Sequence, residues 1–161
     1  MAKELPTSQQ ILTTLAENPK RIAALTAALA PAQLRTRPRD GWSANDVLAH
    51  LRSCADVWGD YIAAMLAEDA PTLRGVDPRT RIKRTNYPEL EFRTSLRSFA
   101  KQRADLLAVL VPLPLKAWSR GATITGGGSA RQRTVHAYAH SLARHERAHL
   151  KQIARIVQAV Q

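Results

Sequence analysis

Apolar residues recur at helical spacing in four stretches of this chain, and this periodicity constrains the fold more than any other feature. The stretches 7–29, 43–66, 90–110 and 134–161 each place apolar side chains three or four positions apart, which is the repeat of one face of an α-helix. No alternation of apolar and polar residues, as in a β-strand, is sustained beyond a few positions. The sequence therefore predicts an all-α fold, a four-helix bundle without a sheet.

Polar residues mark the starts of the first two predicted helices. Thr7 and Ser43 each precede a side chain, three positions later, that can complete a capping box. Pro19 interrupts the first helix. Because Asn18 is a good capping residue for a helix that begins at a proline, the stretch is either one kinked helix or two pieces.

Two connections separate the later helices. The stretch from Asp69 to Pro88 is long, polar and rich in prolines, and connections of this length often have a function. The stretch "ITGGGSARQRT", residues 124–134, is expected to form a flexible loop because of its three consecutive glycines. The chain has 161 residues, a length that suits a single domain over residues 1–161.

The chain is strongly basic, with 24 Lys and Arg against 13 Asp and Glu and a formal charge of +11. Such a balance can indicate a nucleic-acid partner. The charges are scattered, however, and the densest run, "RGVDPRTRIKR", has Tyr87 as its one aromatic neighbour. Because this run offers no stacking platform for bases, a basic nucleic-acid-associated module ranks behind the other functions considered below.

The cysteine content and the terminal sequence bound the class of protein. Cys54 is the one cysteine, which excludes an internal disulfide framework and a cysteine-rich zinc finger. The first residues, "MAKELPTSQQ", lack the apolar core of a signal peptide, and no apolar run is long enough to span a bilayer. We therefore expect a cytoplasmic protein without a membrane partner.

Three histidines are predicted to face the apolar core. "HERAH" matches H-E-x-x-H, the zinc motif of many metalloproteases. At about 100° per residue, His145 and His149 fall on the apolar stripe of the last helix, and Glu146 falls at its edge. His50 lies on the apolar stripe of the second helix. His136 and His140 lie on the opposite face of the last helix, where we expect them to be solvated.

A divalent metal ion would satisfy the ring nitrogens of all three core-facing histidines, and zinc or nickel suits imidazole ligands. The alternative is a purely hydrogen-bonded histidine cluster. A metalloprotease needs a third ligand downstream, yet "LKQIARIVQAVQ" after His149 contains no His, Asp or Glu. The third ligand must come from upstream, and His50 is the candidate.

Three motifs resemble the DinB/YfiT-like superfamily: "GWSANDVLAHL", "KAWSRG" and "AYAHSLARHERAHLKQI". The resemblance covers the chain from about Leu15 onward. It implies a four-helix bundle with up-down-down-up topology, often a homodimer, and a metal site formed by His50, His145 and His149. Some members of the superfamily are transferases that use bacillithiol, mycothiol or glutathione, one is an isomerase of maleylpyruvate, and others have no established activity.

Three protein ligands leave open positions on a metal, as in catalytic sites. A thiol bound there loses its proton, and a bound water is activated likewise. We therefore expect a thiol-dependent S-transferase that acts on a small-molecule substrate with a low-molecular-weight thiol as cosubstrate. The alternatives are a metal-dependent hydrolase and a metal-binding stress-response protein without catalysis.

Three further residues are candidates for roles at this site. Glu146 is either a general base or a carboxylate that supports the ligands or faces the surface. Arg103, in the apolar stripe of the third helix, either packs its stem and directs its charge to water or a carboxylate, or binds substrate. Cys54, one turn after His50, is predicted to be a core residue rather than a ligand.

Overall fold

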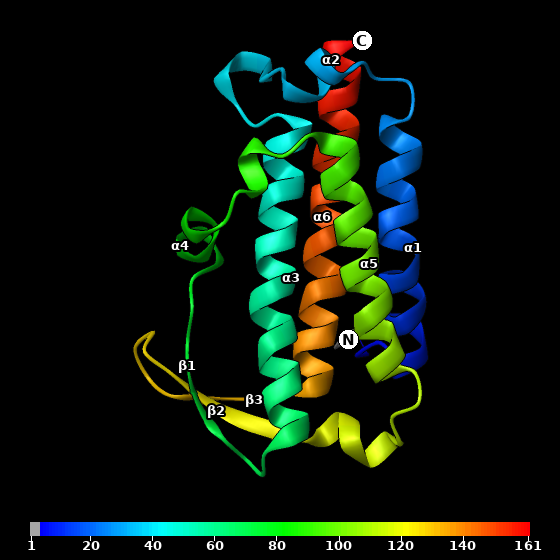
Figure 1. Cartoon of the computed structure of the whole chain (residues 1–161). Helices are drawn as coiled ribbons and strands as arrows, with labels where there is room; N and C mark the ends of the chain where they lie inside the picture. Colours follow the sequence, from blue (N-terminus) through cyan, green and yellow to red (C-terminus); the bar gives the residue numbers. More distant parts are fainter. Residues whose placement is uncertain (1–3) are drawn as a thin grey trace.

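Four long helices dominate the computed structural model, which describes residues 4–161. They are α1 (Ser8–Thr26), α3 (Ala44–Ala67), α5 (Phe92–Leu110) and α6 (Val135–Val160) (Figure 1). Each coincides, to within a few residues at its ends, with one of the four stretches with helical periodicity. The predicted four-helix bundle is therefore confirmed, although a small sheet accompanies it.

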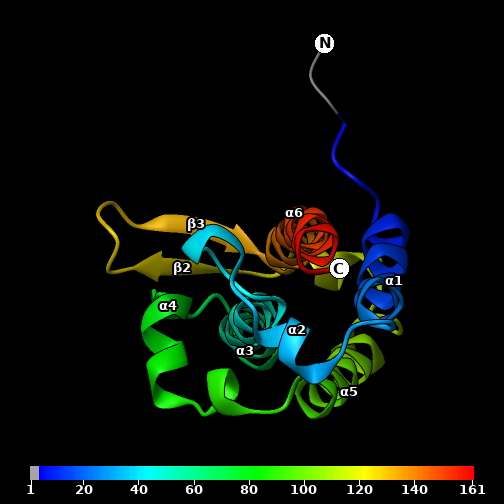
Figure 2. The ribbon, with the colours of Figure 1, turned by 90° about the horizontal axis from the view of Figure 1, so that it is seen from above.

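Viewed from above, the four helices surround a common core in the order α1, α6, α3, α5 (Figure 2). Asn45 Nδ2 near the start of α3 donates to the carbonyl oxygen of Pro88, just before α5, at 2.9 Å, and Arg52 reaches Ser95 further along both helices at 3.0 Å. These two helices therefore run in the same direction. The chain colours in Figure 1 show α1 and α6 running the opposite way.

The predicted capping boxes are present at both helix starts. The backbone N–H of Gln10 donates to Thr7 Oγ1 at 3.2 Å, and the Gln10 side chain accepts from the N–H of Thr7 at 2.9 Å. Ser43 and Asp46 exchange the same pair of bonds at 3.0 and 2.9 Å. These bonds satisfy backbone donors that a helix start otherwise leaves unpaired.

Pro19 lies inside α1, which continues through it as one helix. Proline has no N–H, so the carbonyl oxygen four residues earlier, on Leu15, loses its helical partner. Arg103 Nη1 on α5 donates to that oxygen at 2.9 Å. The two-helix alternative is therefore wrong, because a neighbouring helix supplies the hydrogen bond that the proline removes.

A three-stranded sheet at one end of the bundle contradicts the prediction of a fold without strands. Its order is β1 (Thr72–Arg74), β2 (Gly121–Thr125), β3 (Arg131–Thr134), with β1 parallel to β2 and β2 antiparallel to β3. The predicted loop 124–134 is mostly the turn and second strand of this hairpin. Gly126 and Gly128 have φ of 92° and 95°, which favours glycine.

The connection from α3 to α5 returns along the outer side of α3. After β1 it forms α4 (Pro78–Arg81) and short 3₁₀ turns. Ser53 Oγ on α3 donates to the carbonyl oxygen of Pro78 at 2.7 Å, and the Arg52 guanidinium lies 3.8 Å from the centre of the Tyr87 ring. The connection therefore buries the face of α3 that the other long helices leave open.

A further short helix, α2 (Pro31–Arg35), precedes α3. Within residues 4–161, no helix is both long and apolar enough to cross a membrane.

Candidate metal centre

The three predicted ligands meet where α3 and α6 pack in opposite directions. His145 Nε2 lies 3.1 Å from His50 Nε2 and 3.1 Å from His149 Nε2. One ring nitrogen from each histidine lies within 4.8 Å of the other two. The structure therefore brings together His50, His145 and His149. His50 is 95 residues away in the sequence from His145.

The geometry of the cluster fits a divalent ion. Zn–N bonds of 2.0–2.1 Å in a tetrahedron separate the ligand nitrogens by about 3.3 Å, close to the observed spacing. In a neutral imidazole, only one of the two ring nitrogens carries a proton. The three converging nitrogens therefore cannot all donate hydrogen bonds to one another, and some lone pairs face each other unless a cation lies between them. His145 Nδ1 is buried and has no hydrogen-bond partner in the described chain, so the packing of the cluster, and not a partner at Nδ1, sets the orientation of this ring.

Gln152 orients one of the ligands. His149 Nδ1 donates to Gln152 Oε1 at 2.7 Å. Because the proton is then on Nδ1, the lone pair of His149 is on Nε2, the nitrogen that points into the cluster. A partner of this kind, which fixes the ring and its tautomer, accompanies most histidine ligands of metals.

Burial keeps two of the rings uncharged. Loss of solvent, reinforced by the neighbouring histidines, lowers the pKa of His50 and of His145 to about 4. Both imidazoles are therefore neutral at pH 7 and have a lone pair available for a metal.

The cluster lies at the rim of the core rather than at its centre. All three histidines are partly buried, whereas the sequence predicted that they point into the apolar stripe. Trp42, 43% exposed, stacks on His149 with ring centroids 6.3 Å apart, and Trp58 meets His145 edge to face at 5.2 Å. Two tryptophans therefore border the cluster, and one of them, Trp42, is exposed to solvent.

Cys54 lies beneath the cluster. Its Sγ is 3.6 Å from His50 Nε2 and 4.0 Å from His145 Nε2, and the residue is 2% exposed. Burial, with the charges of Glu146 and Asp77, raises the pKa of the thiol to about 12. Without a metal, Cys54 is thus a protonated core residue beside the ligands.

Glu146 and Arg103 form one buried ion pair. Arg103 Nη1 donates to Glu146 Oε2 at 2.9 Å, Nη2 donates to Oε1, and Asn18 Nδ2 donates to Oε2 at 2.7 Å. Glu146 is 0% and Arg103 is 3% exposed. Glu146 is not one of the clustered ligand residues in the described part of the chain. The structure therefore joins these two candidates to each other, and brings neither into the histidine cluster.

A cavity of about 450 Å³ adjoins the cluster. Trp58, which contacts His145, is part of its wall, and the opposite wall comes from the β2–β3 hairpin. Arg133 lies 4.9 Å from the centre of the Tyr138 ring and donates to Ser141 Oγ at 2.8 Å. Sequence reasoning missed this wall because it treated the hairpin as a flexible loop; the alternation of "ATIT" was the available signal.

The outer pair of histidines is separate from the cluster. His136 Nε2 donates to the carbonyl oxygen of Pro6 at 2.9 Å, and its ring lies 6.2 Å from that of Trp118. His136 and His140 are both partly buried, so the expectation that they are solvated holds only in part. His136 tethers the start of the chain to α6.

Comparison with known proteins identifies relatives of this fold. The solved structure of YfiT from Bacillus subtilis, described as "a probable metal-dependent hydrolase with an unusual four-helix bundle topology", matches with a TM-score of 0.81. The match covers 98% of this chain and 91% of that one at 19% sequence identity, so it shows a shared fold. No curated protein sequence gives a significant match. The sequence pattern of the DinB superfamily matches residues 14–153, most of the chain, and the protein therefore belongs to the DinB superfamily.

Proposed function

We propose that the protein is a metal-dependent enzyme in which His50, His145 and His149 hold one divalent ion, zinc or nickel. The observation that carries this proposal is the convergence of three Nε2 atoms at a partly exposed site beside a cavity. With three protein ligands, the ion would keep a position for an exogenous ligand. It would lower the pKa of a thiol or water bound there and so supply a nucleophile at neutral pH.

The chain's own residues favour a thiol from solution as that nucleophile. Cys54 is buried and protonated, so it is poorly suited to attack a substrate. Glu146 is fully buried and both of its carboxylate oxygens accept hydrogen bonds from Arg103 or Asn18, so it is poorly placed to take a proton from a molecule at the cluster. Activation of water benefits from a nearby base, whereas a metal-bound thiol is already deprotonated. We therefore place thiol-dependent S-transfer ahead of hydrolysis.

The adjoining cavity suits a substrate with an anionic group and a flat apolar part. Trp58, Tyr61 and Tyr138 supply aromatic surface, and Arg131 and Arg133 supply positive charge. Trp58 would position the apolar part next to His145, while the arginines would hold the anion at the hairpin. In this proposal Arg103 and Glu146 stabilise the bundle, and neither acts on the substrate.

Metal-dependent hydrolysis is the second candidate. It is favoured by the likeness in fold to YfiT, which is described as a probable metal-dependent hydrolase. The histidine cluster would serve either reaction, because the difference lies in the molecule that occupies the open position.

Turnover by metal-loaded protein distinguishes the two candidates. An electrophile, such as an epoxide or a halogenated aromatic acid, is incubated with bacillithiol, mycothiol or glutathione, and in parallel a panel of esters and amides is incubated without thiol. We expect conjugation that requires both metal and thiol and is lost in His145→Ala but kept in His136→Ala. Hydrolysis without thiol would support the second candidate. Conjugation that persists after complete metal removal would contradict the mechanism, and no turnover at all would favour a metal-binding stress-response protein without catalysis.

A further inference from the structure

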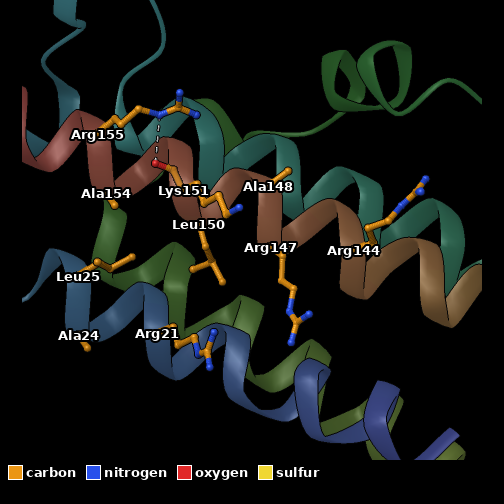
Figure 3. Close-up of a pocket in the computed structure, with 10 residues that line it drawn as sticks. All are labelled: Arg21, Ala24, Leu25, Arg144, Arg147, Ala148, Leu150, Lys151, Ala154 and Arg155. Atoms are coloured by element: carbon orange, nitrogen blue, oxygen red, sulfur yellow. Dashed lines mark hydrogen bonds between the residues drawn. The ribbon is translucent and has the colours of Figure 1, made fainter. Parts of the chain in front are cut away.

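Another cavity lies between α1 and α6, on the other flank of α6 from the histidines. It has a volume of about 980 Å³ (Figure 3). Its floor consists of small and apolar side chains, Leu25 and Leu150 among them. Five basic residues complete the lining, which contains no acidic residue: Arg21, Arg144, Arg147, Lys151 and Arg155. The sequence gives no sign of this concentration, because Arg21 is more than 120 positions from the other four.

The four basic residues of α6 form a row along one face of the helix. Arg144, Arg147, Lys151 and Arg155 are spaced three, four and four positions apart, so neighbours in the row lie one turn apart. All four are exposed, and none forms an ion pair within the described chain. Like charges at this spacing destabilise a helix.

Nothing else on α6 offsets that repulsion. Glu146 is the one acidic residue of α6, and it is buried against Arg103. On α1, Glu17 pairs with Arg21 at 3.1 Å. In Figure 3, Arg147 and Leu150 reach from α6 toward α1, so charge and apolar surface are presented in the same groove. The groove therefore has an unbalanced positive potential above an apolar floor.

We propose that this groove binds an acidic amphipathic helix of a partner protein. The basic row extends from Arg144 to Arg155, 12 residues of α6, or about 16 Å, which is longer than a single phosphate or carboxylate group can neutralise. A helix with carboxylates on successive turns matches the spacing of the row, and an apolar flank on the same helix covers Leu25 and Leu150. This is the mode in which an amphipathic helix enters a groove.

Other occupants match the groove less well. Duplex DNA would neutralise the basic row, but its phosphates gain nothing from the apolar floor. A second copy of the chain carries the same formal charge of +11, so electrostatic repulsion opposes its approach. The groove is also separate from the histidine cluster, since α6 meets α1 on this side and α3 on the other. Partner binding is therefore independent of the proposed enzyme activity.

The probe for this proposal is a fluorescein-labelled synthetic helical peptide with glutamate on successive turns and leucines on the adjoining flank. Binding to the metal-loaded full chain is measured by fluorescence anisotropy. In the variant Arg147→Glu/Lys151→Glu we expect the affinity to fall by about tenfold or more. The matched variant Lys83→Glu/Arg84→Glu removes the same charge from the connection that follows β1, and its affinity should stay within about twofold.

A second variant separates shape from charge. Ala154→Tyr places a large side chain in the groove, on the side that faces Leu25 in Figure 3, and leaves every basic residue in place, so it should also weaken peptide binding. A peptide of the same composition in scrambled order should bind less well than the probe. Circular dichroism and metal content of each variant report whether the fold is intact.

Three results would overturn the proposal. Equal losses in the groove variant and the matched variant would show that the peptide responds to net charge alone. Duplex DNA that binds more tightly than the peptide and is insensitive to Ala154→Tyr would assign the groove to nucleic acid. A change of oligomeric state in Arg147→Glu/Lys151→Glu, measured by sedimentation, would make the groove an interface between copies of this chain.

Discussion

Arg103 on α5 and Glu146 on α6 form an ion pair in the interior of the bundle, with 3% and 0% of their side chains exposed. The pair is connected to α1, because Arg103 also donates to the Leu15 carbonyl oxygen that Pro19 leaves without a helical partner. Asn18 donates to the same carboxylate. One polar network thus connects three of the four long helices.

Breaking this pair on one side should destabilise the protein strongly. Arg103→Met leaves the Glu146 carboxylate buried without its partner, and we expect the free energy of unfolding to fall by about 3–5 kcal/mol. Urea unfolding measures the change. The double variant Arg103→Met/Glu146→Met removes both charges and should lose less than the single variant.

The same pair provides a test of the role of Glu146. Glu146→Gln keeps the size of the side chain and removes its charge. If Glu146 is structural, the variant is less stable but binds metal normally, and any activity of its folded fraction is unchanged. A loss of activity per folded molecule at full metal content would instead restore Glu146 as a general base.

The position of Glu146 could have been predicted more accurately from the helical angles. The buried residues Leu142, Ala139 and Leu150 lie at about 60°, 120° and 140° from His145. Their centre is close to the 100° position of Glu146, so Glu146 faces the middle of the core and His145 lies at the rim. The sequence-based prediction placed the histidines on the apolar stripe and Glu146 at its edge, which is the reverse of their positions in the structure. The structure nevertheless brings the three predicted histidines together, because the periodicity that places each of them on the inner face of its helix is a local property.

The place of β1 in the sheet depends on contacts that are not local. β1 has three residues, and its Thr72 pairs with Thr123, some fifty positions later. A strand that short carries too few residues to show alternation. The basic groove depends in the same way on the packing of α1 against α6. Helices and caps were therefore predictable, whereas the surfaces between distant segments were not.

The ligand assignment predicts a selective loss of metal. His145 is the central residue of the cluster, at 3.1 Å from both other Nε2 atoms. In His145→Ala we expect metal content, measured by elemental analysis of purified protein, to fall to background. His136→Ala, on the far face of the same helix, should retain its metal. Undiminished metal in His145→Ala would contradict the assignment.

The metal-free protein should lose stability as the pH falls. The pKa of His50 and of His145 is lowered to about 4 in the folded chain, whereas in the unfolded chain both return to about 6.5. Between these values the unfolded state binds more protons, so the free energy of unfolding decreases as the pH falls from about 6.5 to about 4. Urea midpoints across this range measure the slope. His50→Gln/His145→Gln should show a shallower dependence, and an equal slope would assign the effect to other groups.

Cys54 should resist alkylation in the folded, metal-free protein. Its pKa is raised to about 12, so at about pH 8 almost none of it is thiolate, the form that reacts. Burial also keeps the reagent away from the sulfur. We expect iodoacetamide labelling, followed by mass spectrometry, to be slow in native protein and complete in urea. Rapid labelling of native protein would show that Cys54 is accessible and would reopen its role as a nucleophile.

Gln152 should contribute to metal affinity without contacting the metal. Its side-chain oxygen accepts a hydrogen bond from His149 Nδ1 at 2.7 Å, which holds the ring in place and keeps the Nε2 lone pair directed at the other two histidines. In Gln152→Ala the ring is free to rotate and to change tautomer. Loss of such a partner typically weakens metal binding by about 10- to 100-fold. Competition with a chelator of known affinity measures this change, and Gln132→Ala, whose amide bonds Thr123 in the hairpin, is the control. If Gln152→Ala and the control bind metal equally well, the orientation of His149 is set by Trp42 and the packing of α6 rather than by this hydrogen bond.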